Sequence, residues 1–184
     1  LLVFGARAGQ SAAIFASEWK EGNAAAVLAQ AIDEKRRVEE RFLNKTGGRE
    51  PIAQIREEMQ KVMEAGAGIY RTHDSLAEAE ETIGKLKERF NDIAITDHSH
   101  TFNTELTTAL ELSYMLDVAE AVIACALNRK ESRGSHQRTD FPKRDDENFL
   151  AHSLVYRNAD GTTRVEYLPV TITRWPPAER VYGK

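Results

Sequence analysis

The residues most able to bind an anion are concentrated in one segment, KESRGSHQRTDFPKRDDENF, which spans residues 130–149. Here Arg133, His136 and Arg138 stand close to several carboxylates. Arginine side chains are usually ordered by a carboxylate, a phosphate or a backbone carbonyl. The segment could therefore be an anion-binding site, a docking surface or a solvated connector. We favour a polar segment in which Arg133 and His136 are buried against a neighbouring surface through charged hydrogen bonds.

Two further histidines suggest a metal site at first sight, because Asp97, His98 and His100 occur together in TDHSHT. Residues two apart can share one face of a strand but not of a helix. No cysteine or matched carboxylate nearby completes a set of metal ligands. We therefore expect a polar loop ahead of a helix cap at Asn103, and we assign no metal site.

The sequence gives only weak evidence for a catalytic nucleophile or for a nucleotide-binding site. Ser135 and His136 are neighbours in sequence, whereas a working nucleophile and its base normally meet across the fold. The glycines near the N-terminus do not form the G-x-G-x-x-G turn of a dinucleotide site. The single cysteine, Cys125, lies in the run VAEAVIACALNR and is expected to pack as a small apolar residue.

Composition excludes some classes of protein. The chain has 184 residues and a formal net charge of −4. A nucleic-acid-binding protein would normally show a basic face, so no nucleic-acid partner is expected. A chain of this length can bury a core without disulfides or a structural metal. No apolar stretch approaches the ~20 residues of a membrane-spanning helix.

Apolar residues recur at intervals of three and four over most of the first 130 residues, which predicts helices. After an apolar segment at residues 1–19, helices are expected over 23–44 and 51–72, and then from a cap at Thr72 or Asp74. The third helix is the most regular, and its apolar residues are Leu76, Ala79, Ile83, Leu86, Phe90 and Ile93.

The fourth predicted helix, residues 103–130, has apolar residues around more of its circumference than the others. It is therefore expected to be the central and most buried helix, with Gly134 as its stop. The leading segment, LLVFGARAGQSAAIFASEW, is apolar on most sides from its first residue. This is typical of a helix inside a larger protein, so we expect the sequence to continue upstream.

The pattern changes after Gly134. Residues 145–150 could form a helical turn, and residues 152–156 and 163–167 alternate as strands around the turn at 158–161. A lone hairpin is marginally stable in water, so it should lie on another surface. We predict a mainly α fold, in which an up-and-down three- to four-helix bundle is followed by a small β-hairpin and an irregular C-terminal tail.

Five motifs occur in an order and at a spacing that point to a known family. They are GIYRT (68–72), NTELTTALEL, RKESRGSHQRTDFP (129–142), DGTTRVEY (160–167) and PPAERVYG (176–183). Together they resemble the C-terminal part of the flavoprotein subunit of fumarate reductase and succinate dehydrogenase. The resemblance covers essentially the whole chain, and LLVFGARAG resembles the helix after that family's flavin-contacting N-R-L-G-S-N-S-L segment.

The resemblance implies a division of the chain into three parts. Residues 1–20 are a remnant of a flavin-domain helix, residues 21–133 form the helical bundle domain, and residues 134–184 form a small β-containing C-terminal tail. The family's residues for FAD, covalent flavin and dicarboxylate binding lie upstream of the matching part, so no catalytic or cofactor-binding residue is assigned. The candidate docking or structural residues are Arg71, Arg133, His136 and Arg138.

In the full-length parent, the resemblance implies interconversion of fumarate and succinate with FAD, which carries the redox chemistry. The implied partners are the flavin-binding domain of the same chain, an iron–sulfur subunit and, indirectly, membrane anchor subunits. Such a complex would be cytoplasmic, peripheral at the inner face of the cell membrane, with electrons passing to or from a quinone. The chain alone is expected to hold no FAD and to be inactive.

Three alternatives remain open. The C-terminal domain of L-aspartate oxidase shares the E-S-R-G-x-H type of segment. A free-standing helical module could bind an acidic partner through residues 129–144. A small independent enzyme could use His98, His100 or His136.

Overall fold

The computed structural model describes residues 1–20 and 22–178, and the chain divides into two compact units, Leu1–Asn44 and Lys45–Lys184. The first unit contains α1 (Leu2–Glu18), α2 (Ala24–Val38) and a π-helical turn, η1 (Glu39–Leu43). Asn23 begins α2 as predicted, because its side chain accepts a hydrogen bond from the Ala26 N–H. No residue of α1 or α2 is buried. The predicted division at residues 20 and 133 stays a prediction.

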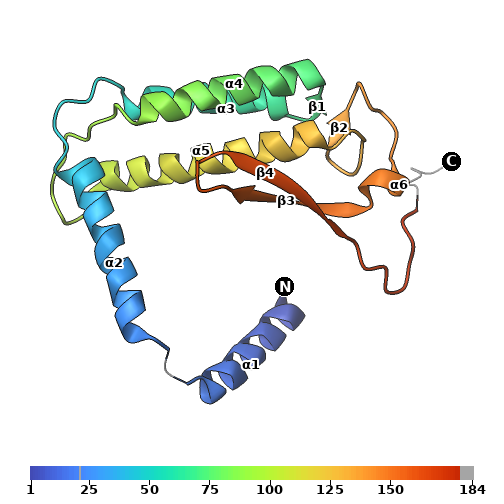
Figure 1. The fold of residues 1–184 in the computed structure, drawn as a ribbon, viewed down its shortest axis with the longest axis horizontal. Helices are drawn as coiled ribbons and strands as arrows, with labels where there is room; N and C mark the ends of the chain where they lie inside the picture. Colours follow the sequence, from blue (N-terminus) through green and yellow to red (C-terminus); the bar gives the residue numbers. More distant parts are fainter. Residues whose placement is uncertain (21, 179–184) are drawn as a thin grey trace. The chain divides into compact units, whose positions relative to one another are not determined.

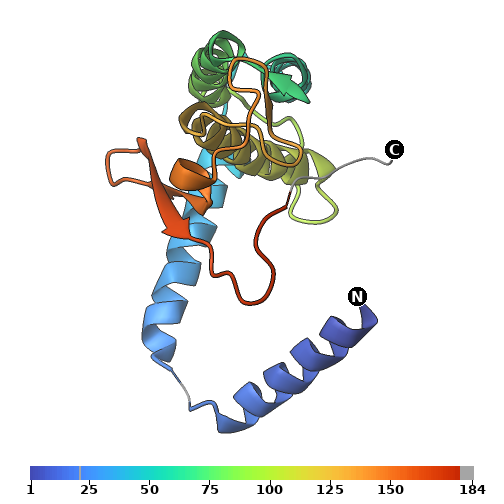
Figure 2. The same cartoon turned by 90° about the vertical axis from the view of Figure 1, so that its right-hand side faces the viewer.

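The second unit holds the elements that surround the candidate site. They are α3 (Ile52–Ala67), β1 (Tyr70–Arg71), α4 (His73–Phe90), α5 (Thr104–Asn128), β2 (Gln137–Arg138), α6 (Asp146–Phe149), β3 (Ala151–Arg157) and β4 (Thr163–Pro169). Figures 1 and 2 show α5 between the α3–α4 pair and the β3–β4 hairpin, and α5 contacts all four. The predicted mainly α fold with a small hairpin and an irregular tail is confirmed.

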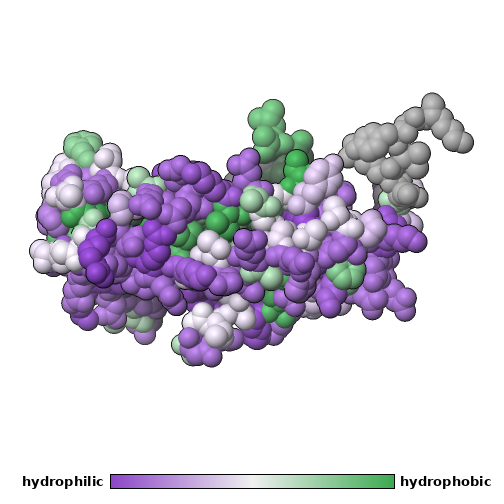
Figure 3. Space-filling view, turned by 90° about the horizontal axis from the view of Figure 1, so that it is seen from above, coloured by the Kyte–Doolittle hydropathy of each residue, from purple (hydrophilic) through white to green (hydrophobic). Residues whose placement is uncertain are grey.

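Helix α4 supplies much of the core, as its spacing predicted. Thr72 is its N-cap, and Ser75 completes a capping box with it. Its buried residues are Leu76, Ala79, Ile83, Leu86 and Phe90. Burial of an apolar stripe stabilises the fold by roughly 25 cal/mol per Å². The outer side chains of α3 and α4 are mostly hydrophilic, as the view from above shows (Figure 3).

Helix α3 ends earlier than the spacing predicted. It stops at Ala67 instead of continuing to Thr72, because the next residues pair with another part of the chain: β1 runs parallel to β2. Gly66 lies against α4, where an added Cβ would be 2.6 Å from the Ala79 Cβ and 2.7 Å from the Ser75 carbonyl oxygen. The backbones of α3 and α4 therefore approach closely at this point.

Helix α5 begins where it was expected and ends sooner. The Asn103 side chain accepts a hydrogen bond from the Leu106 N–H at 2.7 Å, and its amide donates to the Asp97 and Ser99 carbonyls. The prediction that Gly134 stops the helix was wrong, because α5 ends at Asn128. Gly134 instead has a φ of +60° in a later turn, a conformation that favours glycine.

Burial of α5 is one-sided within the described chain. One side packs in the core through residues such as Leu112, Leu116 and Ile123. On the other side Val118 is 62% exposed and Val122 is 39% exposed. α5 was expected to be the central and most buried helix, and within the unit Lys45–Lys184 this second side of it is left partly exposed.

The β-hairpin lies on α5, as expected for a hairpin that cannot stand alone. Val155 is opposite Val165 in its antiparallel register. Arg157 on β3 donates to Asp117 at 2.7 Å and to Glu120 at 3.1 Å, both on α5. These ion pairs join the hairpin to the helix.

The helical turn predicted at residues 145–150 is confirmed as α6, Asp146–Phe149. Asp145 caps it by accepting hydrogen bonds from the Glu147 and Asn148 N–H groups. Residues 179–183 of the PPAERVYG motif lie outside the described residues. Within the described ranges, no helix is long and apolar enough to cross a membrane.

Candidate functional site

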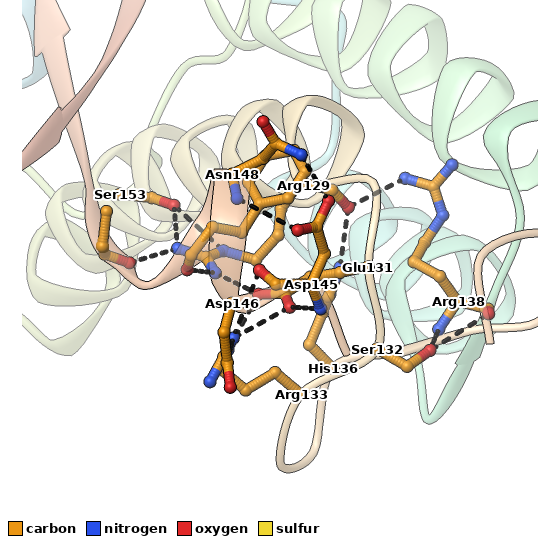
Figure 4. A network of polar contacts seen from close by, with 12 residues as sticks. Arg129, Glu131, Ser132, Arg133, His136, Arg138, Asp145, Asp146, Asn148 and Ser153 are labelled. Carbon is orange, nitrogen blue, oxygen red and sulfur yellow. Dashed lines mark hydrogen bonds and ion pairs between the residues drawn. The ribbon is translucent and has the colours of Figure 1, made fainter. Parts of the chain in front are cut away.

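The segment after α5 folds back over the end of that helix as a network of arginines and carboxylates, which we call the polar cluster (Figure 4). Its members are Arg129, Glu131, Ser132, Arg133, His136, Arg138, Asp140, Asp145 and Asp146. A tight turn joins Arg133 to His136, whose backbone groups exchange hydrogen bonds of 2.9 and 3.0 Å. The β1–β2 pair then places Arg71 beside the cluster, with the Thr139 N–H donating to the Arg71 carbonyl.

Glu131 is the centre of the cluster and is fully buried. Its carboxylate accepts hydrogen bonds from Arg129 at 2.5 Å, from Arg133 at 2.8 and 3.0 Å, and from the Asp145 N–H at 2.7 Å. Burial acts to raise the pKa of Glu131, but these donors outweigh it and hold the pKa below its ordinary value. Glu131 is therefore an ionised counter-charge for two arginines.

Arg138 is 1% exposed and joins the ends of two helices. Its guanidinium donates to both oxygens of Asp140, at 2.8 and 2.7 Å, and to the Ala126 carbonyl in the last turn of α5 at 2.9 Å. Asp140 in turn accepts from the His73 N–H at the start of α4. A cation at the C-terminal end of α5 and an anion at the N-terminal end of α4 both complement the partial charges of the helix ends. The hydrogen bonds from Arg138 hold the pKa of Asp140 well below its usual range.

Arg133 makes two ion pairs instead of facing an open site. Besides Glu131 it contacts Asp146 at 2.6 Å, and its side chain is 27% exposed. Asp146 also binds Arg144 at 2.9 Å. The positive charge of Arg133 is therefore neutralised by carboxylates of the same chain.

His136 is held by both ring nitrogens. Nδ1 is 3.0 Å from Nη1 of Arg71, and Nε2 is 3.1 Å from the carbonyl oxygen of Arg129. Arginine can only donate, so this geometry fits a neutral ring that carries its proton on Nε2. Burial lowers the pKa of His136, and the charges of Arg71, Arg138 and Arg129 act in the same direction.

Arg129 connects the cluster to the hairpin. Its guanidinium donates to Glu131, to the Phe149 carbonyl at 2.8 Å, to the Ala151 carbonyl, and to the Ser153 hydroxyl. The end of α5, the turn of α6 and the start of β3 are thus held by one side chain.

The hydrogen bonds of His136 bear on the candidate nucleophile of the sequence analysis. Both nitrogens of His136 are occupied by Arg71 and Arg129, so it offers no free base to Ser135. Burial raises the pKa of the Cys125 thiol, so nothing in its surroundings favours the thiolate. Asp97 and its neighbouring histidines form a loop in which Asp97 accepts from the Ser99 N–H. Among residues 1–20 and 22–178, no group of three metal-ligating side chains comes together.

All four candidate residues of the sequence analysis lie in this region, and their docking role stays a prediction. Glu131, Asp140 and Arg129 were missed as their partners. The signal was present, since Glu131 stands between Arg129 and Arg133, and Asp140 follows two residues after Arg138. Closely spaced opposite charges on an irregular segment could have been interpreted as internal ion pairs.

Comparisons with known proteins agree with the resemblance of the motifs. The family model described as fumarate reductase flavoprotein C-term matches residues 56–182. The fumarate reductase flavoprotein subunit of Mycobacterium tuberculosis is 58% identical over 187 residues, which cover 100% of this chain and 32% of that protein. The succinate dehydrogenase flavoprotein subunit of Rickettsia bellii is 37% identical over 144 residues, or 74% of this chain and 24% of that protein.

The fold is similar to that of a solved relative. This chain matches a structure of an E. coli quinol fumarate reductase mutant with a TM-score of 0.91 and 46% sequence identity. The match covers 98% of this chain and 31% of the chain in that structure. The chain spans about a third of the length of the curated relatives that it matches. These matches do not favour L-aspartate oxidase or a free-standing module. The chain therefore belongs to the family of fumarate reductase and succinate dehydrogenase flavoprotein subunits, and it corresponds to their C-terminal part.

Proposed function

We propose that the chain is the C-terminal scaffold of a flavoprotein subunit that interconverts fumarate and succinate with FAD. The observation that carries this proposal is the 58% identity to a fumarate reductase flavoprotein subunit over the whole chain. Identity to a succinate dehydrogenase subunit is lower, at 37%. This difference favours the fumarate reductase branch of the family.

The residues of this chain support a structural role within that enzyme. Glu131 and Asp140 neutralise the buried arginines of the polar cluster, so these cations are not free to bind the carboxylates of a substrate. For the same reason the cluster does not fit the phosphates of FAD. We propose that the flavin and the dicarboxylate bind in another part of the subunit, whose orientation the scaffold maintains.

We also propose a set of partners. The scaffold contacts the flavin-binding part of the same subunit and an iron–sulfur subunit, and reaches membrane anchor subunits only through these. In the complete enzyme, electrons would pass to or from a quinone. The complex would be peripheral at the inner face of the cell membrane. A relative named as a flavoprotein subunit supports membership in a complex, and a solved relative named as a quinol-fumarate reductase supports the proposed quinone.

The test uses the full flavoprotein subunit and this chain, purified separately. Each is assayed for bound flavin by absorbance and for fumarate reduction with an artificial electron donor. We expect flavin and turnover in the full subunit and neither in the chain alone. Turnover by the chain alone would contradict the scaffold role, and a full subunit without turnover would contradict the assigned reaction.

A further inference from the structure

An apolar groove, here called the α5 groove, lies along the uncovered side of α5 next to the polar cluster. One part has a volume of about 420 Å³ and is lined by Val118 and Val122 of α5 and by Val155 of β3, with Arg71, Arg129 and His136 at one end. A second part of about 330 Å³ shares Val118 and Val122 and continues past Met63 and Tyr114. The groove thus has an apolar floor and a polar end.

The apolar floor of the groove is exposed to solvent. Tyr114, Val118 and Val122 are spaced four apart and so follow one face of α5. They are 55%, 62% and 39% exposed. A contiguous apolar patch rimmed by polar residues is typical of an interaction surface.

At the polar end of the groove, the cation Arg71 has no counter-charge among the described residues. Arg71 donates to the Gly68 carbonyl at 2.7 Å and to His136 Nδ1 at 3.0 Å. In the described part of the chain no carboxylate lies within ion-pair distance of Arg71, whereas Arg129 has Glu131 and Arg138 has Asp140. The Arg71 side chain is partly buried, and this burial lowers its pKa. A carboxylate from outside would remove this imbalance.

We infer that the α5 groove is the seat of another segment of the same flavoprotein subunit, which lays apolar side chains on Val118 and Val122 and presents a carboxylate to Arg71. This inference rests on the proposed function. The matched relatives are about three times as long as the region they share with this chain, so a large part of such a subunit is available to cover the groove. A segment of the same polypeptide also has a high effective concentration at the site.

Cysteine labelling of the isolated full subunit tests this inference. Val118→Cys places a thiol on the floor of the groove. Lys85→Cys places a matched thiol on α4, where the Lys85 side chain is 64% exposed, close to the 62% of Val118. Labelling by a maleimide is followed by mass spectrometry of each peptide, so that native Cys125 is counted separately. We expect the thiol at 118 to react at least about tenfold more slowly than the thiol at 85, because the covering segment must open first.

The role of Arg71 is tested in the Val118→Cys background. Arg71→Gln should bring labelling at position 118 to within about threefold of the rate at position 85, because the carboxylate loses its partner. Arg71→Lys, which keeps the charge, should retain the protection. Arg49→Gln is the matched control, because Arg49 is an exposed arginine paired with Asp92 outside the groove and should change nothing.

Three outcomes would overturn the inference: equal labelling at positions 118 and 85, protection that survives Arg71→Gln, or protection that appears only when the iron–sulfur subunit is added. The last outcome would assign the groove to a partner subunit. Labelling is read without turnover, so failure of the proposed reaction is distinguished from failure of the groove. A subunit that is protected at position 118 but reduces no fumarate would contradict the reaction and support the groove.

Discussion

Arg71 and Arg138 are register partners in the β1–β2 pair, yet their surroundings differ. Arg138 is 1% exposed, binds both oxygens of Asp140 and meets the carbonyls at the end of α5. Arg71 is half-buried, and within the described chain its guanidinium donates to the Gly68 carbonyl and to His136 Nδ1. The paired arginine joins the ends of α4 and α5, whereas Arg71 has no carboxylate partner among the described residues, which is the basis of the docking role that we infer for it.

The largest effect is expected at the buried counter-charge. Glu131→Ala leaves Arg129 and Arg133 without their shared carboxylate, which should lower the free energy of unfolding by about 3–5 kcal/mol. Urea unfolding followed by circular dichroism measures the change. Glu81→Ala, which removes only the exposed pair with Lys85, is the control and should leave the midpoint unchanged. Equal effects of the two substitutions would refute the central place of Glu131.

Arg138→Met should have the next largest effect. It keeps an apolar stem but leaves Asp140 unpaired and removes the donor to the Ala126 carbonyl. Because Asp140 is partly exposed, we expect a smaller loss of about 2–3 kcal/mol in the same urea experiment. A loss below about 0.5 kcal/mol, the size of an ordinary surface substitution, would show that this pairing does not hold α4 and α5 together.

The same substitution at Arg71, on β1, allows the two arginines to be compared directly. Arg71→Met removes hydrogen bonds to Gly68 and His136 but no ion pair, so the chain should lose only about 1 kcal/mol. The measurement is again the free energy of unfolding. If Arg71→Met cost as much as Arg138→Met, Arg71 would be a second structural cation and not one left for docking.

The smallest effect is a dependence on pH through His136. Its pKa in the folded chain lies below the ordinary value, so the folded state binds fewer protons there than the unfolded state. Stability from this site is present above the unfolded pKa of about 6.5 and is lost as the pH falls through the folded pKa. Between pH ~6.5 and ~5.5 the unfolding free energy should fall by less than about 1.4 kcal/mol. His136→Gln should remove this part of the slope; an unchanged slope would refute the neutral ring between Arg71 and Arg129.

Sequence patterns predicted the parts of the fold that depend on local spacing. α4 was recognised because its apolar positions keep the helical period, and Asn103 was recognised as a cap from its residue type. The end of α3 was missed because β1 pairs with a strand more than 60 residues away, and local propensity carries no such information.

The composition of the sequence located the candidate site, but it did not show which carboxylates pair with the arginines. The arginines of the RKESRG segment were identified as side chains that need partners, yet the choice of Glu131 over an external anion depends on the fold of residues 129–146. The exposed side of α5 was also missed. Apolar residues around a helix indicate that it is covered, but they do not say by which segment.

One measurement tests most directly whether the polar cluster is a scaffold: the effect of Arg133→Ala in the full flavoprotein subunit on the KM for fumarate and on association with the iron–sulfur subunit. Because Arg133 is paired with Glu131 and Asp146, we expect weaker association, by at least about tenfold in Kd, and a KM within about twofold of the unchanged subunit. A large rise in KM with unchanged association would place Arg133 in substrate binding and contradict the account.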